Sequence, residues 1–150
     1  MIGERMATTV PIAEGLFVVE HGEPRLIGSR CSGCGAVYFP RALSCRNPHC
    51  RIKLLERALL PNTGKLLSYT IQRYQPPPLF RMDDWAPYPI GLIDLGDGVQ
   101  VMGMLTGMAH EDIRIGMALR LVIEPLFTDA VRGSVATYKF APDSDGVQTR

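Results

Sequence analysis

The sequence has no excess of charge of either sign, few aromatic residues and no long apolar run. Sixteen Lys and Arg face fifteen Asp and Glu, so the formal net charge is +1 and no overall field would attract a nucleic acid. A membrane-spanning helix needs about 18 or more apolar residues in a row, and no such run occurs. Residues 1–10 lack the apolar stretch of a signal peptide, so we expect a cytoplasmic protein.

Groups that carry out catalysis are also scarce. The three histidines, His21, His49 and His110, lie in turn-like or polar stretches, where histidine side chains are usually solvated. Asp83 and Asp84 are adjacent carboxylates in the central loop, and we interpret them as solvated too. No glycine-rich phosphate-binding loop is present. We therefore expect no catalytic residue on this chain.

The four cysteines lie within 20 residues, as Cys31, Cys34, Cys45 and Cys50 in a C-x2-C-x10-C-x4-C pattern. Cytoplasmic thiols stay reduced, so clustered cysteines are typical of metal ligands. Four thiolates in a tetrahedral array favour structural zinc, and iron bound as in rubredoxin would need the same ligands. His49 could replace Cys45 or Cys50, although its other interpretation is a loop residue near the site.

The segment pattern predicts an all-β chain with an N-terminal zinc ribbon followed by a five-stranded barrel. The 46% hydrophobic content suffices for a compact core. The ribbon is too small to have a core of its own, so we expect a zinc ion to hold it together. Chelation of the zinc should then unfold the ribbon and leave the barrel folded. Five strands with a long third connection indicate an OB-fold, with another five-stranded sheet as the alternative. The expected parts are a loose or briefly helical segment 1–14, the ribbon 15–58, the barrel 59–141 and a flexible tail 142–150. The expected strands are 15–20, 25–30, 65–75, 89–95, 99–106, 117–124 and 134–140.

Several short motifs stand out along the chain: Cys31–Cys34 with Gly35, Pro40-Arg41, Cys45, Cys50, Pro87–Gly91, Asp97-Gly98, Ile115–Met117 and Tyr138–Phe140. Together they resemble a family of small proteins, long labelled a domain of unknown function, that join a rubredoxin-like zinc ribbon to an OB-fold. The Cys45–Cys50 spacing is wider than the two intervening residues usual in that family. The resemblance implies a zinc-binding accessory subunit of a thiolase-type acyl-CoA acyltransferase, docked on a homodimeric catalytic subunit and sharing its coenzyme A thioester. A partner of an enoyl-CoA hydratase is an alternative within the family.

A nucleic-acid-binding OB module is the alternative outside the family. Proteins of that class interleave aromatic and cationic residues on strand faces. Tyr69, Arg73 and Tyr74 are the main residues of that type here, and the balanced net charge argues against this function.

Two further groups of residues are candidate binding sites. Arg46, Arg51 and Lys53 belong to the most basic stretch, residues 41–57, and could bind the phosphates of coenzyme A. Their other interpretation is that they offset the negative charge of a four-thiolate zinc centre. The proline-rich stretch 75–87 is apolar and stiff, which favours partner docking, unless its side chains only cover one end of the barrel. The candidate docking residues are Phe80, Met82, Trp85 and Tyr88.

Overall fold

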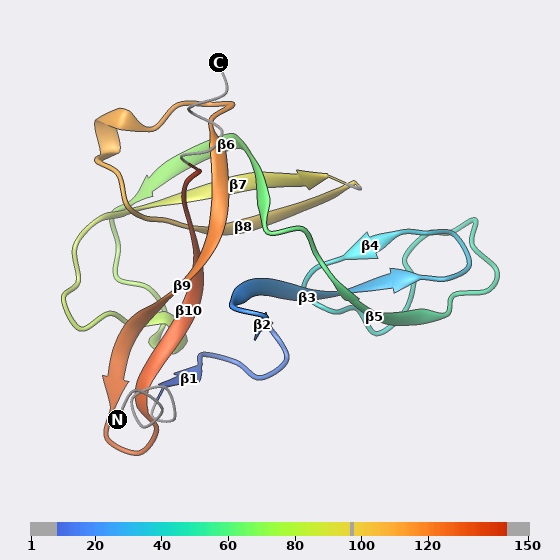
Figure 1. The fold of residues 1–150 in the computed structure, drawn as a ribbon, viewed down its shortest axis with the longest axis horizontal. Coiled ribbons are helices and arrows are strands. Elements are labelled where there is room, and N and C mark those ends of the chain that lie inside the picture. Colours follow the sequence, from blue (N-terminus) through green and yellow to red (C-terminus); the bar gives the residue numbers. More distant parts are fainter. Residues whose placement is uncertain (1–8, 97, 144–150) are drawn as a thin grey trace.

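Figure 1 shows the fold as a computed structural model, which describes residues 9–96 and 98–143. Strands dominate, and two short 3-10 helices, η1 (Pro78–Phe80) and η2 (His110–Asp112), lie in the connections. The expected tail 142–150 falls mostly outside the described residues, as do residues 1–8. Within the described ranges, no helix has both the length and the apolar character needed to cross a membrane.

Five strands form the expected closed barrel: β6 (Thr63–Gln72), β7 (Tyr88–Gly96), β8 (Val99–Leu105), β9 (Ala118–Asp129) and β10 (Gly133–Pro142). Strands β6, β7 and β8 pair in antiparallel succession, and β9 pairs with both β6 and β10. A short parallel pairing that places Phe140 beside Leu105 joins β10 to β8. The resulting closed order β10-β8-β7-β6-β9 confirms the OB-fold.

The period-two pattern of the strands builds the barrel interior. Ile93 and Val101 pair across β7 and β8, and both are fully buried. Phe140 fills the space beside Gly103, where a Cβ atom would approach its ring to 3.0 Å. The missing side chain of Gly103 therefore makes room for the largest fully buried side chain, that of Phe140.

The cysteine-bearing segment forms a smaller sheet that projects to one side of the barrel in Figure 1. Its central strand β3 pairs with β2 to form the hairpin that the sequence predicts. The far half of β3 pairs with β4 and β5, two strands that the sequence analysis did not predict. The strands are β2 (Phe17–Glu20), β3 (Glu23–Cys31), β4 (Val37–Tyr38) and β5 (Leu55–Leu59).

The ribbon and the barrel share one hydrophobic core. Leu26 of β3 is 0% exposed and belongs to the same buried cluster as Leu66 and Ile93 of the barrel. Phe17 and Phe39 pack against this cluster from the ribbon side. The Arg25 side chain also donates a hydrogen bond from Nε to the Leu60 carbonyl at 2.6 Å. The ribbon thus has no separate core, as expected, but one of its leucines lies inside the barrel's cluster. This packing argues against the expectation that chelation unfolds the ribbon without affecting the barrel.

Two connecting segments also differ from the sequence-based expectation. Residues Thr9–Pro11 form strand β1, which pairs in parallel with β10, where a loose or helical segment was expected. The central loop contains η1, and Phe80 at its end packs against a second buried cluster around Phe127 and Val135. Both segments are held by contacts distant in sequence, which local patterns do not reveal.

Candidate metal centre

The four cysteines converge at the end of the ribbon. Cys31 is the last residue of β3, Cys34 lies in the turn that follows, and Cys45 and Cys50 lie between β4 and β5. All four Sγ atoms are within 4.8 Å of one another. The Sγ atoms are 3.7 Å apart in the Cys31–Cys50 pair and 3.6 Å apart in the Cys34–Cys45 pair. These separations suit one ion surrounded by four thiolates at about 2.3 Å each.

The first knuckle is shaped by backbone hydrogen bonds and a left-handed glycine. The Gly35 amide donates to the Cys31 carbonyl at 2.7 Å, and the Cys31 amide donates to the Ala36 carbonyl at 2.9 Å. Gly35 has a φ of 81°, a value that glycine adopts without steric cost. The turn thereby directs Cys34 back toward Cys31.

The second knuckle spans four intervening residues and is held both by its own hydrogen bonds and by the Lys53 side chain outside it. Within the knuckle, Asn47 accepts the His49 amide on Oδ1 at 3.0 Å and the Cys50 amide on its carbonyl at 3.0 Å. From outside, the Lys53 ammonium donates to the Asn47 carbonyl at 2.8 Å and to the Cys45 carbonyl at 3.2 Å. The extra length of this knuckle is thus stabilised by polar contacts.

The surroundings of the Cys31 thiol lower its pKa and so favour its ionisation. Burial raises its pKa, but two backbone amides and two neighbouring thiols lower it, and the resulting pKa is about 6. A thiolate is the form that binds a metal ion, so Cys31 itself favours the ligand form near neutral pH. The amides are those of Cys34 and Gly33, and the thiols those of Cys50 and Cys45.

Tyr38 of β4 is a neighbour of the metal site that the sequence analysis missed. Its hydroxyl accepts the Arg46 amide at 2.8 Å, which leaves its own proton to donate toward Cys45 Sγ at 3.5 Å. This hydroxyl, followed by the Asn47 amide, lowers the pKa of Cys45. The pairing of β4 with β3 places Tyr38 beside the strand that ends at Cys31, and the short strand β4 was not predicted from the sequence.

The candidate residues around the centre occupy different environments. His49 is exposed, and its ring is not among the groups that converge on the site. The Arg46 guanidinium lies over the Tyr38 ring, 5.1 Å from its centroid, and Arg51 is exposed. The structure therefore brings the cysteines together, leaves Arg51 in solvent and ties the Lys53 ammonium to the second knuckle.

The candidate docking residues of the central loop lie on the barrel, away from the thiols. Phe80 and Met82 are half-buried and pack against the cluster around Phe127. The half-buried rings of Trp85 and Tyr88 meet edge to face, with centroids 6.1 Å apart. Phe80 and Met82 thus pack on the barrel, and a docking role for the four residues stays a prediction.

These features define a class of protein: a rubredoxin-like zinc ribbon joined to an OB-fold barrel. Residues 22–56 match the ChsH2 rubredoxin-like zinc ribbon domain, and residues 58–124 match the ChsH2 C-terminal OB-fold domain. A DUF35 domain-containing scaffold protein of Methanocaldococcus jannaschii is 35% identical over 119 residues, which cover 78% of this chain and 81% of that protein. The chain therefore belongs to the DUF35 family of ChsH2-type proteins, and its four clustered cysteines support a structural zinc site.

Two further relatives are named as enzymes or enzyme complexes. A probable enoyl-CoA hydratase alpha subunit of Thermomonospora curvata is 32% identical over 97 residues, covering 65% of this chain and 28% of that protein. A solved structure described as Ltp2-ChsH2(DUF35) aldolase superposes with a TM-score of 0.57 and 28% identity, covering 77% of this chain and 84% of that one. The family is thus associated with acyl-CoA enzymes.

Proposed function

We propose that this chain is a cytoplasmic, zinc-binding accessory subunit of a thiolase-type acyl-CoA acyltransferase, and that the reacting groups belong to a homodimeric catalytic partner. The observation that carries the proposal is the convergence of every cysteine of the chain on one candidate metal centre. A thiolase needs a free, reactive thiolate as nucleophile, and four thiols that ligate one ion cannot supply it. The kinship with scaffold proteins supports a role in assembly.

Zinc bound by Cys31, Cys34, Cys45 and Cys50 would supply structure rather than catalysis, because four protein ligands leave no open position for a substrate. The donor set fits zinc because all four ligands are thiolates at one point of the ribbon. The surrounding residues hold the ligands: Tyr38 donates to one sulfur, and the Lys53 amide donates to Cys50 Sγ at 3.4 Å.

A thiolase is the proposed partner because of a closer resemblance within the family. The long central loop, residues 75–87, and the Cys-Arg-Asn-Pro-His-Cys knuckle look most like those of the small subunit of benzoylsuccinyl-CoA thiolase. The structural similarity to a chain of an aldolase complex is consistent with an enzyme as the partner. An enoyl-CoA hydratase is the second candidate, since a relative bears that name.

Co-purification from the native source tests the partner. Affinity-tagged chain should retain a thiolase-like subunit together with about one zinc per chain, measured by elemental analysis. Recovery of a hydratase instead would favour the second candidate. Metal-free material, or a purified chain that by itself cleaves a β-ketoacyl thioester, would contradict the proposal.

The basic side of the ribbon is proposed to assist coenzyme A binding. Residues 22–58 hold seven Lys and Arg against two Asp and Glu. Arg51 is exposed, and a guanidinium fork suits phosphate oxygens. The charge reversal Arg51→Glu should weaken coenzyme A binding to the complex by roughly tenfold at low salt, as loss of one charge-assisted contact would. The same reversal at Arg120, an exposed residue of β9 in the barrel, is the control and should change affinity little.

For variants of Lys53 and Arg46, zinc content must be measured together with coenzyme A affinity. The Lys53 ammonium binds a carbonyl of the second knuckle, and Arg46, a residue of that knuckle, stacks on Tyr38. If Lys53→Glu weakens coenzyme A binding only in proportion to lost zinc, its role is structural. Equal coenzyme A affinity in wild type and Arg51→Glu would remove the phosphate proposal and leave the assembly role intact.

A further inference from the structure

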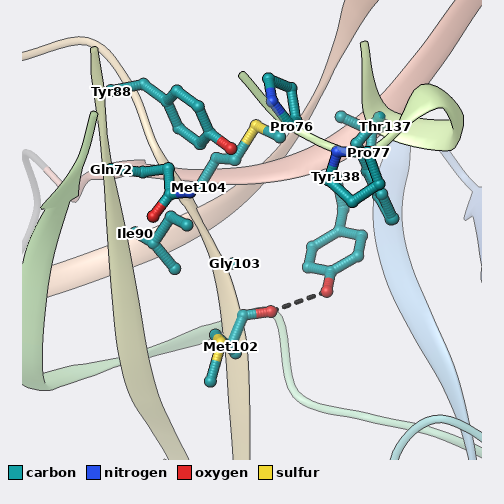
Figure 2. Close-up of a pocket in the computed structure, with 11 residues that line it drawn as sticks. Gln72, Pro76, Pro77, Tyr88, Ile90, Met102, Gly103, Met104, Thr137 and Tyr138 are labelled. Atoms are coloured by element: carbon teal, nitrogen blue, oxygen red, sulfur yellow. Dashed lines mark hydrogen bonds between the residues drawn. The ribbon is translucent and has the colours of Figure 1, made fainter. Parts of the chain in front are cut away.

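We propose that an apolar pocket on the outer wall of the barrel binds the uncharged acyl and pantetheine portion of a thioester. This inference rests on the proposed association with an acyl-CoA enzyme and names a second, distinct contact with its ligand. The pocket has a volume of about 400 Å³, within the range of small-molecule sites. It lies between the central loop and strands β7, β8 and β10 (Figure 2).

The outer face of the barrel is apolar at this place, where a polar face is expected. A sheet with one face in a core normally presents polar side chains on the other. Here Ile90 pairs with Met104, and Leu92 pairs with Met102, on the outward-facing positions of β7 and β8. Met102 is 63% exposed although it has no polar group. Such a surface indicates a site that is covered when the protein functions.

The walls of the pocket carry no charged side chain. Figure 2 shows Tyr88 and Tyr138 on either side of Gly103, with the Tyr138 hydroxyl donating to the Met102 carbonyl at 2.7 Å. Burial raises the pKa of Tyr138 to about 12, so this phenol stays neutral. The coenzyme A phosphates therefore do not fit this pocket, whereas the uncharged part of the ligand does.

Polar groups in the lining match the amide and carbonyl groups of a pantetheine chain. The side chains of Gln72 and Tyr88 form no hydrogen bond with any other residue of the described ranges. An amide and a phenol can each donate and accept, so both could bind an amide or a thioester carbonyl. Thr137, only 1% exposed, contributes a further hydroxyl-bearing side chain to the wall. An apolar slot with a few polar groups is the usual chemistry of a small-molecule site.

The loop wall of the pocket is fixed before a ligand arrives. Phe80 lines the pocket and packs against the buried cluster around Phe127. The Arg81 guanidinium lies 3.9 Å from the centroid of the Phe127 ring and 3.7 Å from Asp129 Oδ2. Pro76 and Pro77 stiffen the same wall. A preformed wall lowers the entropy lost on binding.

Titration of the zinc-loaded chain with S-acyl pantetheines of increasing length tests the pocket. Trp85 is the single tryptophan and its ring contacts Tyr88, which lines the pocket, so its fluorescence should respond. Affinity should rise about fourfold for each added methylene until the pocket is full, the factor given by ~0.8 kcal/mol per buried methylene. No saturable response with any chain length would overturn the inference.

A pair of variants on one strand locates the binding. Met102→Glu places a carboxylate in the lining and should weaken S-acyl pantetheine binding by roughly tenfold or more. Gln100→Glu adds the same charge on the same outward face of β8, two residues away and outside the lining, and should leave affinity unchanged. Equal affinity in Met102→Glu and wild type would overturn the inference.

The remaining outcomes separate this inference from the proposed function. If acyl-CoA binds but S-acyl pantetheine does not, the phosphates alone hold the ligand, and the pocket inference fails while the proposed function stands. If no thioester binds and Met102→Glu abolishes co-purification of the enzyme subunit, the pocket receives a side chain of the partner instead. Failure of any acyl-CoA enzyme to co-purify would refute the proposed function, whatever the pocket binds.

Discussion

Replacing Leu26 by alanine should destabilise the barrel as well as the ribbon. Leu26 belongs to the zinc-ribbon strand β3, yet it is 0% exposed and packs in the barrel's buried cluster with Leu66 and Ile93. Truncating a leucine at such a site removes its buried methyl groups and leaves a cavity, at a cost of about 3–5 kcal/mol. For a chain of this size each kcal/mol lowers Tm by roughly 2–4 °C, so the Tm should fall by roughly 6–20 °C.

Two probes on opposite parts of the molecule measure this effect. Trp85 fluorescence reports on the barrel, and the thiolate absorption of cobalt-substituted protein reports on the ribbon. Both transitions should move together to lower temperature in Leu26→Ala, because one cooperative core serves both parts. Leu43→Ala is the matched control, since Leu43 is a fully exposed leucine of the same ribbon and should cost less than about 0.5 kcal/mol. An unchanged fluorescence transition beside a lowered cobalt transition would refute the shared core.

Three further predictions concern the knuckle, the loop and the barrel. Tyr38→Phe removes the hydroxyl beside Cys45 and should weaken zinc binding roughly tenfold against a competing chelator; equal affinity would contradict the contact. Trp85→Ala should reduce partner co-purification while zinc content stays constant. A loss of zinc with unchanged co-purification would count against a docking role for the loop. Gly64→Ala brings a Cβ atom to 2.5 Å from the Asp94 carbonyl oxygen and should lower the free energy of unfolding by about 1–3 kcal/mol. A urea midpoint equal to that of the wild type would disprove this effect.

The parts of the fold that sequence predicts are those with local signals. The hairpin of β7 and β8 follows from two alternating runs around a glycine turn, and Gly96 and Gly98 adopt φ values of 88° and 73°. The metal site can likewise be predicted from the clustered cysteines, because metal-ligand spacing is a short-range sequence pattern. These signals suffice for the order of ribbon and barrel.

The missed features depend on contacts between distant segments. Strand β5 exists because Leu55–Leu59 pairs with β3, about 30 residues earlier in the sequence. Tyr38 is part of the same sheet, and Leu26 of β3 packs in the barrel core. The burial of Leu26 and the hydroxyl contact of Tyr38 have no local sequence signature. Strand propensity indicates a residue that fits a half-buried surface, but it does not indicate which partner that residue will contact.

The two surfaces proposed to contact a thioester, the basic ribbon and the apolar barrel pocket, differ in chemistry. One aromatic contact, between Phe39 and Tyr138, links them. The ribbon carries the excess of positive charge, whereas the barrel pocket is uncharged. Phe39 of the ribbon packs edge to face on Tyr138, which lines the pocket, with ring centroids 5.8 Å apart. Coenzyme A thioesters have the same division, a charged nucleotide at one end and an uncharged acyl chain at the other. A ligand that spanned both surfaces would bind more weakly whenever the contact between ribbon and barrel loosened. Zinc, by holding the ribbon, would then affect acyl-chain affinity without touching the ligand.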